Sequence, residues 1–184
     1  MLFRRENSAD RFESLVREHQ RPIYRVAYRL CGSAEEAEDL VQETLIEAFE
    51  SFPRFREGTH FDRWVFRIMR NTFIDGVRRK PRAHIESLDT GLLDKSGEML
   101  AREIVDLASA PDTEMMARTL DEPVQNALDT LPPEFKLVVV LADIEGMSYE
   151  EVSRVAGCPV GTVRSRLHRG RAILKDKLKN YVRF

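Results

Sequence analysis

Apolar residues recur every three or four positions along almost the whole chain, which predicts a protein built of α-helices. Serine, proline and glycine positions divide this pattern into segments. At Pro22 we expect one helix to have stopped and the next to begin, because proline is accepted in the first turn of a helix and not in its interior. Ser33, with Glu36 three residues on, forms a capping box that opens another helix. The front half is therefore predicted to hold helices over 8–20, 22–31, 33–49 and 61–80.

The periodicity weakens from residue 82 to residue 120, where glycines, serines and acidic residues interrupt it. This composition predicts a flexible linker. Helical spacing returns over 121–131 and again over 134–145. The second of these segments is rich in valine, but its Pro-Pro start and Gly146 favour a helix over a strand. We therefore expect an all-α protein in which two small helical domains, 1–81 and 121–184, are joined by an acidic linker, 82–120.

A strong motif lies near the C-terminal end. Ser148 and Glu151 form a second capping box, which opens a short helix. Gly157-Cys158-Pro159 then forces a turn, and a longer basic helix follows from Val160. A short helix, a tight turn and a basic second helix are typical of a DNA-reading helix-turn-helix. A solvated basic surface helix is the alternative, and the motif alone does not separate a repressor from other promoter-binding proteins.

The charge distribution agrees with a nucleic-acid partner for the C-terminal half. The net charge is −2, divided as +1 over residues 1–81, −7 over 82–130 and +4 over 131–184. The two cysteines, Cys31 and Cys158, have no CxxC or histidine partners, so neither a disulfide framework nor a metal site is expected. A catalytic Ser/His/Asp set and a phosphate-binding glycine loop are also missing from the sequence, which argues against an enzyme and gives no reason to expect a cofactor.

Four sequence blocks carry a resemblance to a known family. GMSYEEV (146–152) and GCPVGTVRSRLHRGR (157–171) closely resemble the promoter-binding fourth region of extracytoplasmic-function (ECF) sigma factors, group 4 of the sigma-70 family. AEDLVQETLIEAF (37–49) looks like the core-polymerase-binding helix of that family's second region. FDRWVFRIMRNTFIDGVRR (61–79) looks like the helix that meets the melted −10 element. These blocks cover most of the chain outside the linker.

The resemblance implies specific surfaces. Residues 33–50 carry seven acidic residues and no Lys or Arg, which suits a basic partner; the implied partner is the clamp of the largest subunit of RNA polymerase. A solvated acidic face is the alternative. The side chains expected to bind core polymerase are Asp39, Gln42, Glu43 and Glu47. Those expected at the −10 element are Phe55, Arg56, Thr59, His60, Arg63, Arg67, Arg70, Asn71 and Arg78. Those expected at the −35 element are Thr162, Arg164, Ser165, Arg166, His168, Arg169 and Arg171.

The function that follows is that of an alternative sigma factor, a non-enzymatic subunit that directs core RNA polymerase to promoter DNA. An anti-sigma factor is expected as an inhibitory partner. With no apolar run long enough for a membrane helix and no signal peptide, a cytoplasmic location is expected, with any membrane attachment provided by the anti-sigma factor. The alternative is a helix-turn-helix regulator that binds duplex DNA without core polymerase.

Overall fold

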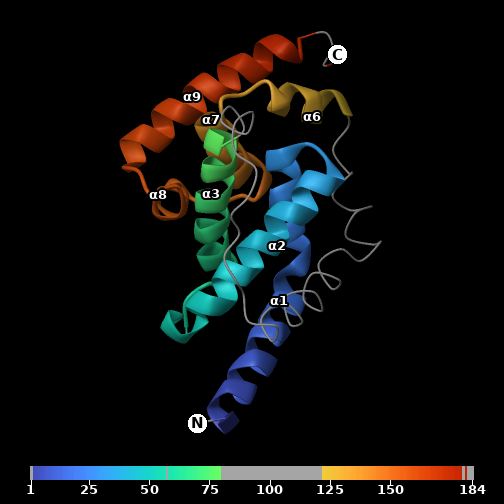
Figure 1. The fold of residues 1–184 in the computed structure, drawn as a ribbon. Helices are drawn as coiled ribbons and strands as arrows, with labels where there is room; N and C mark the ends of the chain where they lie inside the picture. Colours follow the sequence, from blue (N-terminus) through green and yellow to red (C-terminus); the bar gives the residue numbers. More distant parts are fainter. Residues whose placement is uncertain (1, 57, 80–121, 180, 182–184) are drawn as a thin grey trace.

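The computed structural model describes residues 2–56, 58–79, 122–179 and 181, and within them all regular structure is helical (Figure 1). The first domain contains α1 (Leu2–Cys31), α2 (Ala34–Ser51), the short 3₁₀ turn η1 (Phe52–Arg54) and α3 (Phe61–Arg79). The second domain contains α6 (Glu122–Asp129), α7 (Pro133–Val139), the π-helical segment η2 (Val140–Ile144), α8 (Tyr149–Ala156) and α9 (Val160–Lys177). The predicted all-helical fold with two helical domains is confirmed. The predicted linker, 82–120, lies outside the described residues.

The predicted break at Pro22 is wrong, because α1 continues through it as one long helix. A proline inside a helix removes a backbone hydrogen bond and costs about 3 kcal/mol. Phe12 and Val16 before the proline and Ile23 and Ala27 after it are all completely buried in the same core. The burial of one continuous apolar face therefore offsets the local cost of the proline.

The first domain is held together by aromatic packing at one end of its three helices. The ring of Phe12 meets the rings of Phe52 and Phe61 edge-on, at centroid distances of 5.1 and 5.8 Å. Such edge-to-face pairs add to the free energy gained from apolar burial. The side chain of Ser33 caps α2 by accepting a hydrogen bond from the backbone N–H of Glu36 (3.2 Å), as the sequence predicts.

The predicted helix over 134–145 is only partly correct, because it widens into a π-helical segment after α7. The backbone N–H of Glu145 bonds to the carbonyl of Val140, five residues earlier, at 3.0 Å. Val140 and Leu141 are both completely buried. The widened segment therefore remains part of the hydrophobic core.

The predicted helix-turn-helix is present in α8, the following turn and α9. The capping box is complete: the backbone N–H of Ser148 donates to the carboxylate of Glu151 (2.9 Å), and the N–H of Glu151 donates to the hydroxyl of Ser148 (3.3 Å). Gly157 ends α8 with a φ of +62°, a conformation that favours glycine. α9 then packs so closely on α7 that a Cβ at Gly170 would lie 2.9 Å from Cγ2 of Val139.

The two domains pack against each other, an arrangement the sequence left open. α3 lies against α7 and α8, and the end of α1 lies against α6 (Figure 1). α1 also contacts η2. A bidentate ion pair joins Arg25 of α1 to Glu145, with N–O distances of 2.7 and 2.6 Å. Lys136 donates to the carbonyl of Leu30 at 3.0 Å. None of the described helices carries an apolar stretch of the length needed to cross a bilayer.

Candidate polymerase and promoter interfaces

The recognition helix α9 separates a buried apolar stripe from an exposed polar face. Val163 and Leu167 are buried against the rest of the second domain. The polar side chains predicted for the −35 element lie on the other faces of the helix, where a major groove can reach them. Thr162 is half-buried, and the exposed members of the set are Arg164, Ser165, His168, Arg169 and Arg171.

Two of the arginines predicted for the −35 element make contacts inside the domain. The guanidinium of Arg166 lies 3.7 Å from Sγ of Cys158, in the turn before the helix. Arg171 forms a bidentate ion pair with Asp143, at 3.1 and 2.6 Å. The hydrogen bond to Asp143 raises the pKa of Arg171, with a second contribution from Tyr149. These two arginines therefore also hold the turn and the helix in place.

The loop before α3 carries four of the nine residues predicted for the −10 element. Arg56, Thr59 and His60 are exposed, and the hydroxyl of Thr59 donates to the carbonyl of Arg56 at 2.6 Å. Phe55 differs from its neighbours because it is half-buried. Its ring stacks on Phe52 with a centroid distance of 5.7 Å and an interplanar angle of 11°. It therefore belongs to the aromatic cluster that supports the loop, and a role in DNA binding stays a prediction.

The predicted arginines of α3 have different surroundings. Arg67 and Arg78 are exposed. Arg70 donates to the side-chain oxygen of Asn71 at 2.6 Å. Arg63 is paired with Glu151 of α8 at 2.8 Å, and its Nε and Nη1 are buried with no hydrogen-bond partner among the described residues. In this arrangement Arg63 is held by the second domain.

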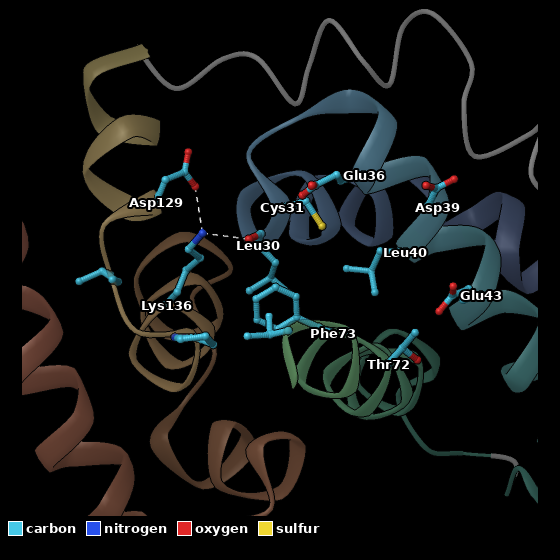
Figure 2. A pocket seen from close by; sticks show the side chains of 14 residues that line it. Leu30, Cys31, Glu36, Asp39, Leu40, Glu43, Thr72, Phe73, Asp129 and Lys136 are labelled. Carbon is cyan, nitrogen blue, oxygen red and sulfur yellow. Dashed lines mark hydrogen bonds and ion pairs between the residues drawn. The ribbon is translucent and has the colours of Figure 1, made fainter. Parts of the chain in front are cut away.

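The acidic face of α2 borders a groove of about 360 Å³ between the two domains (Figure 2). Asp39 and Glu43, both predicted to bind core polymerase, line it and are exposed. Of the other two predicted positions, Glu47 is exposed and Gln42 is half-buried. The remaining wall is mostly apolar, with lining residues that include Leu30, Leu40, Phe73, Val77 and Leu131.

The groove has a polar end that sequence reasoning missed. Lys136 is buried there between the carboxylate of Asp129 (2.9 Å) and the carbonyl of Leu30, as Figure 2 shows. Beside it, Arg29 donates to the side-chain oxygen of Gln125 at 2.9 Å, and burial lowers the pKa of Arg29. No periodicity or motif marks these residues, because the contacts of Lys136 with Leu30 and of Arg29 with Gln125 span 106 and 96 positions of the sequence.

The helix-turn-helix, whose second helix is basic and exposed, defines the class of a DNA-binding protein. Two family descriptions match the chain: Sigma-70 region 2 over residues 15–83, and Sigma-70, region 4 over residues 121–174. The chain belongs to the ECF sigma factors of the sigma-70 family.

Related proteins cover most of this chain. The ECF RNA polymerase sigma factor SigE of Mycolicibacterium smegmatis is 44% identical over 174 residues, which span 92% of this chain and 62% of that protein. The ECF RNA polymerase sigma factor SigW of Bacillus subtilis is 31% identical over 176 residues, which span 96% of this chain and 93% of SigW.

Two solved structures resemble the fold. The sigma factor RpoE of Bartonella quintana, in complex with the anti-sigma factor NepR, matches with a TM-score of 0.63 and 28% identity, over 87% of this chain and 92% of RpoE. CnrH in complex with the cytosolic domain of CnrY has a TM-score of 0.61 and 22% identity, over 96% and 95% of the two chains, and supports the fold alone.

Proposed function

We propose that this chain binds core RNA polymerase through α2 and directs it to promoters that it reads at two elements. The observation that carries the proposal is the presence of both family regions in one chain, each with its polar face exposed. The same observation favours a sigma factor over a regulator that acts without polymerase, because a stand-alone regulator has no need of the first region. The proposed division is 1–81 for polymerase and the −10 element, and 121–184 for the −35 element.

In the proposed mechanism, α9 enters the major groove of the −35 duplex. Arg164, Ser165, His168 and Arg169 share its exposed surface, and arginine and serine are side chains that bind base edges and phosphates. Arg171 is proposed to reach a phosphate only when its ion pair with Asp143 is exchanged for the DNA backbone.

The first domain is proposed to capture the unpaired strand of the −10 element. Single-stranded DNA requires cations along its backbone and surfaces or pockets for unstacked bases. The exposed Arg56, Thr59 and His60 supply part of such a surface, and Arg67 continues it along α3. The proposed contribution of Arg63 requires its release from Glu151, so the domains must separate before this surface is complete.

Partners and location follow from the same proposal. The related RpoE was solved with the anti-sigma factor NepR, and we propose that a protein of this inhibitory kind also binds the present chain. The apolar groove with Asp39 and Glu43 at its edge is a suitable surface for it or for the polymerase clamp. The protein is proposed to work in the cytoplasm, where the polymerase is, and to make or break no covalent bond itself.

A binding assay with charge-reversed α2 tests the first step. We expect Asp39→Arg combined with Glu43→Arg to weaken the affinity for purified core polymerase at least about tenfold, because like charges then face the partner. Glu35→Arg combined with Glu50→Arg makes the same charge change at exposed acids of the same helix outside the groove and is the matched control. If both variants lose affinity equally, or neither does, α2 does not provide the docking surface.

A further inference from the structure

A second hollow, of about 640 Å³, lies between the two domains on the side of the helix-turn-helix. Its walls come from the end of η1, from the loop before α3, from α3 itself and from α8. Arg154 and Val155 are the contributions of α8 besides Glu151. The first domain contributes Arg54, Arg56, Gly58, Thr59, His60, Arg63, Trp64 and Arg67. The hollow therefore exists only while the two domains are packed together.

The charge around this hollow is strongly one-sided. Five arginines and a histidine line it, and Glu151 is the sole carboxylate among the described lining residues. That carboxylate is already occupied, because it accepts the capping hydrogen bonds of Ser148 and the ion pair with Arg63. Like charges gathered within a Debye length of about 10 Å repel one another, so the packed arrangement has a positive potential that a bound anion would relieve.

We propose that this hollow is a binding site for a small polyphosphate anion, of the class of nucleoside triphosphates and inorganic tripolyphosphate. Guanidinium groups bind phosphate oxygens through paired N–H donors, and here they come from both sides of one cavity. The volume is that of a typical ligand site and exceeds what one phosphate group would fill. Trp64 adds an aromatic surface to the wall, on which a nucleobase can stack.

Occupation of the site has a consequence for the domains. An anion that contacts Arg154 from one domain and Arg54, Arg56 or Arg67 from the other binds the packed arrangement only. By mass action it stabilises that arrangement as its concentration rises above its dissociation constant. The bound anion also covers Arg56, Thr59 and His60. These residues form the proposed −10 surface, so the anion would keep that surface from binding DNA. This consequence for DNA binding rests on the proposed function.

The test uses the full chain and measures binding of sodium tripolyphosphate by calorimetry. Arg154→Glu, an exposed change in the second domain, should weaken binding about tenfold or more because it replaces attraction with repulsion. Lys177→Glu makes the same charge change on α9 away from the hollow and should alter the dissociation constant less than about twofold. Amide hydrogen exchange should slow at α8 and at the start of α3 at the same tripolyphosphate concentration.

Parallel titrations with ATP and with a short single-stranded DNA identify the source of the phosphates. Equal affinities for ATP and tripolyphosphate support a site for the phosphate chain alone, and tighter binding of ATP supports stacking on Trp64. Equal losses in the two charge variants, or Arg154-dependent binding of single-stranded DNA without any of tripolyphosphate, would overturn the inference. Promoter-specific transcription with core polymerase tests the proposed function separately, so either idea can fail while the other stands.

Discussion

The ion pair between Arg25 and Glu145 lets the packing of the two domains be weakened by one substitution. The Glu145 side chain is 6% exposed and the Arg25 side chain 38% exposed. The hydrogen bond that Arg25 donates to Glu145 is the main cause of the raised pKa of Arg25. Arg25→Ala leaves a buried carboxylate without its partner in the packed state, whereas water can solvate that carboxylate once the domains separate. Removing one partner of a buried pair costs 3–5 kcal/mol in general. Discounting for the exposure of Arg25, we expect about 2 kcal/mol, or about a thirtyfold rise in the ratio of separated to packed molecules.

A substitution of the other partner, Glu145, is expected to have a smaller effect on the packing of the domains. Glu145→Gln keeps a side-chain oxygen that can still accept from the guanidinium, and the charge left behind on Arg25 is partly hydrated. We expect about 1 kcal/mol for this change. The double variant should be less open than Arg25→Ala alone, because no buried charge is then left unpaired.

Single-molecule energy transfer measures the ratio directly. Dyes are placed at the exposed positions Glu50 of α2 and Lys177 of α9, in a chain whose Cys31 and Cys158 are replaced by serine. Arg17→Ala removes a surface ion pair with Glu13 inside α1 and should leave the transfer distribution unchanged. An Arg25→Ala protein that is folded by circular dichroism but has the same distribution as the Arg17→Ala control would refute the reasoning.

Three further predictions concern the second domain. Gly170→Ala should destabilise the protein by about 1–2 kcal/mol in urea unfolding, because the new methyl group meets a stiff valine of α7, whereas Gly161→Ala has open space and should be neutral or stabilising by up to about 1 kcal/mol. Hydrogen bonds in the capping box are the main cause of the lowered pKa of Glu151. The stabilisation of the folded state by ionised Glu151 is therefore complete above the ordinary pKa of 4.5, and it is lost as the pH falls through the lower pKa of the folded state. Glu151→Gln should therefore reduce stability at neutral pH and flatten the acid side of a melting-temperature profile. Arg164→Ala should weaken promoter binding by holoenzyme by about 1–3 kcal/mol in a filter-binding titration, while Arg171→Ala, which loses its bond to Asp143, should also lower the melting temperature.

The elements of the fold could be predicted from local sequence wherever capping and periodicity agree. Ser33 and Ser148 both cap helices as expected, and Gly157 ends α8 in the left-handed conformation. Pro22 misled the prediction because the free energy of burying a continuous face is not visible in the local rule for proline. The π-helical widening at Val140 likewise depends on core packing around it.

The packing of the domains was beyond sequence reasoning for a different reason. Its contacts join single polar residues far apart in the chain, such as Arg29 with Gln125 and Lys136 with the carbonyl of Leu30. Each of these side chains also reads as an ordinary solvated residue on a helix surface. The exposed face of α9 could be predicted because one helix carries the whole pattern, whereas the hollow beside Arg154 needs two domains to form.

The central claim is tested most directly by run-off transcription with purified core RNA polymerase on a library of promoter sequences, with and without this protein. The account predicts transcripts from a defined subset of promoters that share two sequence elements, and only when the protein is present. It also predicts that Arg164→Ala reduces those transcripts without abolishing the affinity for core polymerase. Absence of any protein-dependent transcript, together with tight binding of duplex DNA by the protein alone, would contradict the account and identify a regulator that acts without polymerase.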